Sequence, residues 1–219
     1  MPETNSGKSD NYIKRISCGI DNCFIIRQGD HAILVDSGRK RYRQKILTAA
    51  REEDVELLVL THGHYNHVCN AALISEDLDI PVAMHAADVD LLSDNHLQRM
   101  HANTFLGYIA MLYCHKIRRN PYIQRFYPEV YLQEGDKLDD FGIDARVIEL
   151  PGHTLGSIGL DVWGTDLIVG DACNNKPRPG KAIFYGNRDM MEKSCEKITA
   201  IGDRMVHLGH GDSIPNRVW

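Results

Sequence analysis

No apolar run in this sequence approaches the roughly 20 residues that a membrane-spanning helix needs. The first residues, MPETNSGKSDNY, are polar and lack the apolar stretch of a secretory signal. We therefore expect a cytoplasmic protein that has no membrane partner.

Cysteine is sparse, and its pattern excludes the familiar paired motifs. The six cysteines are scattered, and none forms a C-x-x-C pair. In a reducing cytoplasm we expect free thiols, most of them buried as small hydrophobic residues. Cys69 and Cys173 stand close in sequence to candidate metal ligands, so a metal role stays open for both.

Other signatures are missing as well. The chain has no phosphate-binding P-loop, dinucleotide fingerprint or serine nucleophile elbow. Its formal net charge of −5 gives no electrostatic reason to expect nucleic acid as a partner. With 219 residues, 43% of them hydrophobic, the chain can form one sizeable domain or two closely packed halves.

Apolar and β-branched stretches predict strands that alternate with helices. We expect a hairpin over 23–38 that turns at Gly29 and Asp30, a helix over 40–53 and a strand over 56–60. Further strands are expected over 145–150, within 158–171 and over 204–208. This order is typical of a layered α/β domain.

Residues 85–127 are predicted to be largely helical. The apolar side chains there recur at the spacing of one helix face: Phe105, Leu106, Ile109, Leu112 and Tyr113.

The second half of the chain repeats a feature of the first. When Asp36 is aligned with Asp171, Gly29 falls on Gly164, and AILVD falls on LIVGD. This match suggests a duplicated half-domain, although two generic hairpins would match by chance about as often.

The stretch THGHYNHVCN, residues 61–70, places His62, His64 and His67 within six positions. Neutral imidazole is the commonest protein ligand for zinc and related metals. The preceding VELLVL predicts a buried strand, so these histidines should lie on a loop at its C-terminal end.

Three more candidate ligands follow predicted strands beside glycine residues: His153, Asp171 and His210. Any one of them alone is more often a turn or surface residue. Four strand ends that carry this set together indicate a metal site.

Two further motifs, the G-H-T-x-G-S turn at 152–157 and the D-S-G at 36–38, accompany the histidine cluster and the later ligands. With this set of motifs, the chain resembles the metallo-β-lactamase superfamily, in particular its glyoxalase II and lactonase branch. The resemblance spans about residues 12–212. It implies a four-layered αβ/βα sandwich of two similar halves, forming a single domain over 1–219 with a helical insertion at about 85–127. The metal site would lie along one edge, between the halves.

The resemblance also implies roles for individual residues. A first metal would be held by three histidines, His62, His64 and His153. A second metal would be held by two more, His67 and His210. Asp171 would bridge the two metals. Asp36 would orient a ligand without binding metal itself. One or two divalent ions are expected, with Zn²⁺ as the first choice and Fe or Mn as alternatives.

Asn66, which would be a ligand of the second metal and with Asp171 would take part in catalysis, departs from the family, where aspartate is usual at this position. An amide can bind zinc through its oxygen, but it brings no charge and cannot act as a base near neutral pH. The second metal is therefore expected to bind weakly, and Asn66→Asp is expected to tighten it.

The chemistry that the resemblance implies is hydrolysis by a metal-bound hydroxide, which would attack the carbonyl of a small thioester, ester or lactone. A thiolate leaving group needs little protonation, which suits a site without an acid at position 66.

Two basic segments could contact an anionic small-molecule substrate such as glutathione. One is HKIRRNPYIQR, which contains Arg118 and Arg119, although a solvated helix end explains its charges at least as well. The other is the loop 176–188, with Phe184, Tyr185 and Arg188 as candidate contacts.

Two alternatives to a small-molecule hydrolase remain. Asn66 supports a metal-binding or sensing protein with little turnover. A nuclease is disfavoured, because the chain is acidic and short. Metal analysis and a thioester panel would separate the first alternative from the hydrolase.

Overall fold

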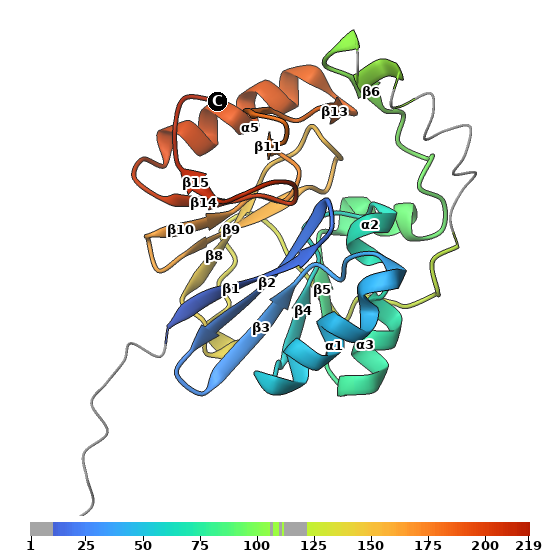
Figure 1. Cartoon of the computed structure of the whole chain (residues 1–219), viewed down its shortest axis with the longest axis vertical. Coiled ribbons are helices and arrows are strands. Elements are labelled where there is room, and N and C mark those ends of the chain that lie inside the picture. Colours follow the sequence, from blue (N-terminus) through green and yellow to red (C-terminus); the bar gives the residue numbers. More distant parts are fainter. Residues whose placement is uncertain (1–10, 106, 110, 112–121) are drawn as a thin grey trace, which may run out of the picture.

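The computed structural model describes residues 11–105, 107–109, 111 and 122–219, and two β-sheets form its centre (Figure 1). Within these residues, one sheet has six strands in the spatial order β1 (Tyr12–Cys18), β2 (Asp21–Gln28), β3 (His31–Val35), β4 (Leu57–Val59), β5 (Val82–Met84) and β7 (Val130–Tyr131). The other has five, in the order β15 (Ile214–Pro215), β14 (Met205–His207), β10 (Asp166–Ile168), β9 (Ile158–Val162) and β8 (Ala145–Glu149).

Helices cover the outer faces of both sheets (Figure 1). On the six-stranded sheet lie α1 (Arg43–Glu52) and α3 (Ala71–Leu78), and on the five-stranded sheet lies α5 (Arg188–Ala200). This layer order is the αβ/βα sandwich that was predicted. Among the described helices, none is both long and apolar enough to cross a membrane.

Short elements complete the description. The helical ones are η1 (Lys40–Tyr42), α2 (Tyr65–Val68), η2 (Ala86–Leu92) and η3 (Asp139–Phe141). Two small ribbons pair β6 (His101–Ala102) with β13 (Phe184–Tyr185), and β11 (Cys173–Asn175) with β12 (Pro179–Lys181).

Alternation of apolar side chains along the strands produces the layers. Because successive side chains of a strand point to opposite faces, Ile25 and Leu34 pack toward α1 and α3, whereas Phe24 and Ile33 pack toward the second sheet. A third cluster joins the second sheet to α5 through Met191 and its neighbours. Burial of these apolar faces is the main force that holds the two sheets together.

The two halves share a local topology. The hairpin β2–β3 is antiparallel and turns at Gly29, and the hairpin β9–β10 is antiparallel and contains Gly164 in its turn. Both glycines have positive φ, 58° and 66°. Asp36 directly follows the first hairpin and Asp171 comes three residues after the second. A helix and then a parallel strand come later in both halves, β4 in the first and, after β11–β13 and α5, β14 in the second. The repeat suggested by the sequence is therefore also present in the arrangement of the chain.

The expectation of a largely helical segment over 85–127 is corrected by the structure. After η2 the chain forms turns, bends and β6, and 122–128 has no regular structure, so the helical residues that follow η2 in the described part are Phe105, 107–109 and Met111. The side chain of Asn95 bonds the carbonyls of Leu91 and Gly63, and such side chain–backbone bonds compete with helix formation.

The two described members of the predicted apolar helix face are exposed. Phe105 is 77% exposed and Ile109 is 48% exposed. The other members, Leu106, Leu112 and Tyr113, lie outside the described residues.

Candidate metal centre

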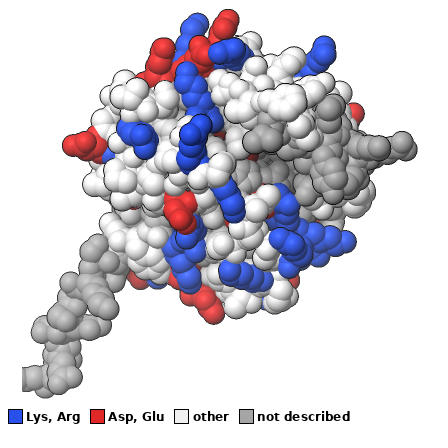
Figure 2. Space-filling view, turned by 45° about the horizontal axis from the view of Figure 1, so that its top comes forward, with Lys and Arg blue, Asp and Glu red and all other residues white. Residues whose placement is uncertain are grey.

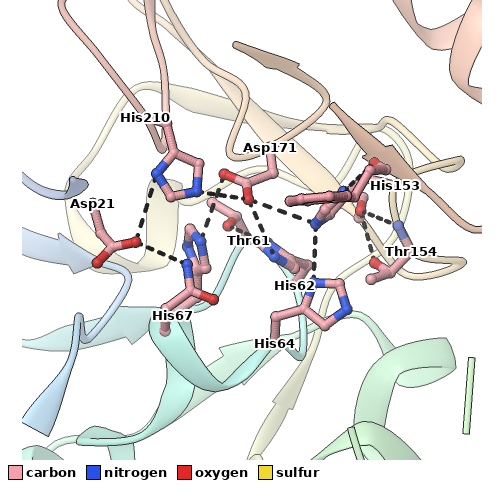
Figure 3. A network of polar contacts seen from close by, with 12 residues as sticks. Asp21, Thr61, His62, His64, His67, His153, Thr154, Asp171 and His210 are labelled. Atoms are coloured by element: carbon pink, nitrogen blue, oxygen red, sulfur yellow. Dashed lines mark hydrogen bonds and ion pairs between the residues drawn. The ribbon is translucent and has the colours of Figure 1, made fainter. Parts of the chain in front are cut away.

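The candidate ligands converge where strands of both sheets end (Figure 3). The loop after β4 and the short helix α2 carry three of them, and the segments after β8, β10 and β14 carry the others: His62, His64 and His67; His153; Asp171; and His210. The structure thus brings together the six residues that the sequence singled out.

Three histidines form one group of possible metal ligands. One ring nitrogen from each of His62, His64 and His153 lies within 4.8 Å of the others. His64 Nδ1 is 2.9 Å from His153 Nε2. Because His153 Nδ1 donates to the carbonyl of Phe184 at 2.7 Å, its Nε2 is the atom that remains for a ligand.

Asp171 joins this group to the remaining histidines. Its Oδ2 lies 3.6 Å from His153 Nε2 and 3.1 Å from His210 Nε2, and its Oδ1 lies 3.6 Å from His67 Nε2. His62, His67 and Asp171 form a second group whose ligand atoms lie within 4.8 Å of one another. One carboxylate therefore faces both groups, as a bridging ligand would.

Buried hydrogen bonds orient the rings. Asp36 Oδ2 accepts from His67 Nδ1 at 2.7 Å, and Asp36 Oδ1 accepts from the backbone N–H of Thr61 at 2.8 Å. The Thr61 hydroxyl also contacts His62 Nδ1 at 3.1 Å. His210 Nδ1 donates to the carbonyl of Ile20 at 2.7 Å. In His62, His67 and His210 these bonds occupy Nδ1 and direct Nε2 toward the centre.

The donor atoms at the centre fit a divalent metal ion. Three of them are buried and have no hydrogen-bond partner among the described residues: His62 Nε2, His67 Nε2 and Asp171 Oδ1. Such atoms are rare in folded proteins, because leaving them unpaired costs free energy. Imidazole nitrogen and carboxylate oxygen suit zinc, iron and manganese, and an ion at this point would satisfy all three atoms.

The surroundings move the pKa values of the ligands in opposite directions. Burial, and then the neighbouring histidines, lower the pKa of His62 and His64 well below the usual range. Burial would also lower the pKa of His67, but the carboxylates of Asp36 and Asp171 raise it well above the usual range. For Asp171 burial is outweighed by His210 and His67, which hold its pKa well below the usual range. Without metal, the three-histidine group is therefore neutral, whereas His67 is a cation.

Asn66 lines the cavity at this centre, and its amide is held by a residue that the sequence analysis missed. Asn66 Nδ2 donates to Asp21 Oδ1 at 3.0 Å. Asp21 is only 1% exposed, and it also forms an ion pair with Arg39. No spacing rule links a carboxylate at the start of β2 to a histidine motif more than 40 residues later, which is why sequence reasoning did not find it.

Asp88 is a second residue that sequence reasoning missed. Its buried carboxylate accepts from the backbone N–H of Gly63 and of Gly156, both at 2.8 Å, and from the Thr154 hydroxyl at 2.6 Å. A Cβ at Gly156 would lie 2.9 Å from this carboxyl group, so only glycine fits there. Asp88 thus ties the loop of His62 and His64 to the loop of His153.

Two adjoining hollows, of about 230 and 310 Å³, open at the centre. Both are lined by Ile20, His153, Asp171, Phe184 and His210. The smaller hollow continues past Lys176 and Ile183, and the larger one continues past Tyr65, Met100 and Met111. A small molecule could therefore extend to both sides of the candidate ligands.

Among the predicted substrate contacts that the structure describes, one lines the two hollows and two do not. Phe184 lines both hollows. Tyr185 and Arg188 line neither of them; Tyr185 stacks on His101, the exposed Arg188 pairs with Glu192 at 3.1 Å, and both border a separate hollow beside His101, so their role as substrate contacts stays a prediction. Arg118 and Arg119 lie outside the described residues.

The described cysteines are free thiols, as predicted: Cys18, Cys23, Cys69, Cys173 and Cys195. The Cys69 thiol donates to the carbonyl of Gly38, and the Cys173 sulfur lies 3.9 Å from that of Cys195. Neither Cys69 nor Cys173 belongs to the two groups of possible metal ligands found among the described residues.

A two-sheet sandwich with such a centre between its halves defines a class of metal-binding proteins, and the sequence agrees. The chain matches the family model of the metallo-beta-lactamase superfamily over residues 16–210, and it belongs to that family. A relative from Mycobacterium leprae, described as an uncharacterized protein, is 30% identical over 88% of this chain and 87% of its own length. The hydroxyacylglutathione hydrolase of Aeromonas salmonicida is 22% identical over 95% of this chain, which spans 64% of that enzyme.

Solved structures show the same fold. The B3 metallo-beta-lactamase BLEG-1 superposes with a TM-score of 0.74 at 20% identity, covering 93% of this chain and 94% of that one. A protein crystallised in a di-iron-bound form superposes with a TM-score of 0.66 at 21% identity, over 93% of this chain and 94% of its own. The likeness covers both sheets, since it extends over nearly the whole chain.

Proposed function

We propose that this protein is a metal-dependent hydrolase that cleaves a small ester, thioester or lactone. The observation that carries the proposal is the set of buried nitrogen and oxygen donors that face one another without hydrogen-bond partners among the described residues, at the junction of two hollows. The candidate ligands, among them His62, His153 and Asp171, would hold a divalent ion there, and such an ion would supply Lewis-acid polarisation of a carbonyl group and a lowered pKa of a bound water. Zinc, iron and manganese all suit the donors, and a di-iron form is known for one structural neighbour.

The protein's own residues favour a leaving group that needs little protonation. The Asn66 amide cannot donate or remove a proton as a carboxyl group does near neutral pH. The three-histidine group is neutral in its surroundings and therefore offers lone pairs rather than acid protons. A thioester, which releases a thiolate, fits these constraints, and the distant hydroxyacylglutathione hydrolase relative supports this substrate class.

The lining of the hollows favours a partly apolar substrate. Ile20 and Phe184 border both hollows, and Met100 and Met111 extend the larger one. Lys176 in the smaller hollow could pair with a carboxylate of an anionic substrate. We therefore propose an acyl compound with an apolar group on one side of the scissile bond and a charged or polar group on the other.

A small molecule fits better than a nucleic acid. The chain carries a formal net charge of −5, and on the face drawn in Figure 2 Asp and Glu side chains lie among the Lys and Arg side chains. Binding to the phosphate backbone of nucleic acid draws on clustered basic residues. The alternative is a metal-binding or sensing protein with little turnover. The amide of Asn66, in place of the usual carboxylate, is the observation that supports it.

Metal analysis followed by turnover measurements on three substrate panels would test the proposal. Purified protein should contain a divalent metal, and it should hydrolyse members of a panel of acyl thioesters, aryl esters and lactones. Removal of the metal should abolish turnover, and its return should restore it. Metal binding without turnover on any panel would favour the sensing alternative, and a protein that binds no metal would refute both.

A further inference from the structure

The strongest unexplained feature is Asp21, a buried carboxylate beside the candidate centre. It begins β2, is 1% exposed, and has Arg39 and Asn66 as its partners. Arg39 Nε lies 2.5 Å from Asp21 Oδ2, and the Arg39 NH2 donates to Asp21 Oδ1 at 3.0 Å. The guanidinium thus makes one hydrogen bond to Asp21 Oδ1 and a close ion-pair contact with Oδ2, and it neutralises the buried carboxylate.

The orientation of Asn66 follows from this arrangement. A carboxylate can only accept hydrogen bonds, so the end of the Asn66 amide that faces Asp21 must be its NH2 group. The amide oxygen then points away from Asp21. Asn66 lines the same hollow as His64, Asp171 and His210, so this oxygen is available to a group bound there.

Asp21 also lies close to His210. Asp21 Oδ1 lies 3.5 Å from His210 Nδ1, and the neighbouring carbonyl of Ile20 accepts from the same ring nitrogen. Figure 3 marks the contact between Asp21 and His210 with a dashed line. One short segment, 20–21, therefore positions both Asn66 and His210.

We propose that Asp21 is a positioning residue for the second half of the metal centre, and that Asn66 is an amide because Asp21 is its neighbour. The proposal rests on the metal centre described above. A carboxylate at position 66 would place an oxygen about 3 Å from an oxygen of Asp21, and like charges at that distance repel strongly in a buried site. The amide instead donates to Asp21 and presents its oxygen to the hollow.

This arrangement revises the expectation that Asn66→Asp tightens the second metal. With Asp21 in place, the new carboxylate would be turned away or would disrupt the pair between Asp21 and Arg39. If Asp21 is changed to asparagine at the same time, an amide again faces a carboxylate, with the two groups exchanged. The single change should therefore fail where the double change succeeds.

The test is a cycle of four proteins: wild type, Asn66→Asp, Asp21→Asn and the double variant. Zinc stoichiometry at limiting metal and the affinity of the second ion are measured by calorimetry and metal analysis. We expect each single variant to bind the second ion at least about tenfold more weakly than wild type, the size of effect seen when groups that orient ligands are changed. The double variant should bind it at least as tightly as wild type. Asp30→Asn, in the exposed turn after β2, is the control and should behave as wild type.

Three results would overturn the proposal. They are a second ion that binds more tightly to Asn66→Asp alone, a double variant no better than the worse single variant, and a second ion that binds neither wild type nor the double variant at saturating zinc. If Asp21→Asn is poorly folded by itself, the double variant, which carries the same substitution, is decisive. A folded double variant shows that the pairing of residues 21 and 66 matters, and an equally unfolded one shows that the substitution at Asp21 damages the fold in general. Turnover is not measured, so inactivity on the substrate panels would refute the proposed function and leave this result standing.

Discussion

His67 and Asp36 are joined by a buried hydrogen bond of 2.7 Å between His67 Nδ1 and Asp36 Oδ2. Both residues are at most 1% exposed. The carboxylate orients the ring and turns its Nε2 toward Asp171. Asp36 has a φ of 64°, a conformation that costs free energy for any residue except glycine and that is kept here by the contacts of the carboxylate.

We predict that Asp36→Asn weakens metal binding through His67. In the wild type, His67 and Thr61 donate to the two carboxylate oxygens of Asp36. In the variant the amide turns an NH2 group toward one of them, so either the bond from His67 or the bonds from Thr61 are lost. The affinity for the second ion should fall by about 10- to 100-fold. Metal titration followed by calorimetry would measure this, and an unchanged second affinity would show that His67 needs no such partner.

We predict that His62→Ala removes metal from the whole centre. His62 belongs to both groups of possible ligands, so its loss weakens each of them. Metal analysis should show a protein with little bound metal, and hydrolysis should be lost with it. His31→Gln is a suitable control, because His31 is half exposed and pairs with Glu56 far from the site. Full metal content in His62→Ala would refute the assignment.

The opposite pKa shifts predict that the protein releases different numbers of protons when it binds the first and the second ion. Carboxylates raise the pKa of His67 well above its usual range, so the metal-free protein carries a proton there at pH 7, and a metal must displace it. His62 and His64 have lowered pKa values and are already neutral. The affinity of the second ion should therefore rise with pH up to the raised pKa of His67, whereas that of the first should be nearly constant above about pH 6.5.

Calorimetry at pH 7 in two buffers of different ionisation enthalpy would measure these protons. The heat of binding the second ion should depend on the buffer, and that of the first should depend on it much less. Equal dependence for the two ions would contradict the assignment of His67 to the second ion.

The sequence predicted the layered fold and the set of candidate ligands, because both leave local signals. Strand-forming stretches end directly before His62, His153, Asp171 and His210, and short spacing marks the first cluster. Asp21 and Asp88 leave no such signal, since their partners lie far along the chain and depend on how the two sheets meet. Over 93–104 and 122–128 the structure lacks the predicted helix, and near the first of these stretches Asn95 forms backbone bonds that periodicity does not reveal.

Asp88 offers a prediction about stability as well as metal binding. Its replacement by alanine leaves the buried N–H groups of Gly63 and Gly156 without their acceptor, whereas the hydroxyl of Thr154 keeps Ser157 as a partner. Each unsatisfied buried group costs about 1–3 kcal/mol, so the free energy of unfolding should fall by roughly 2 kcal/mol or more. The three-histidine group should also bind metal more weakly, because these bonds hold its two loops together.

Chemical denaturation of metal-free protein would give the stability, and zinc titration would give the affinity. Asp90→Ala is the matched control, since Asp90 lies in the same short helix η2 and is exposed. If Asp88→Ala does not fold, Asp88→Asn tests the same point, because its amide keeps one acceptor oxygen and should give a smaller loss. Equal stability and equal zinc affinity in the Asp88 and Asp90 variants would mean that the two ligand loops are held by their own backbone bonds and not by this carboxylate.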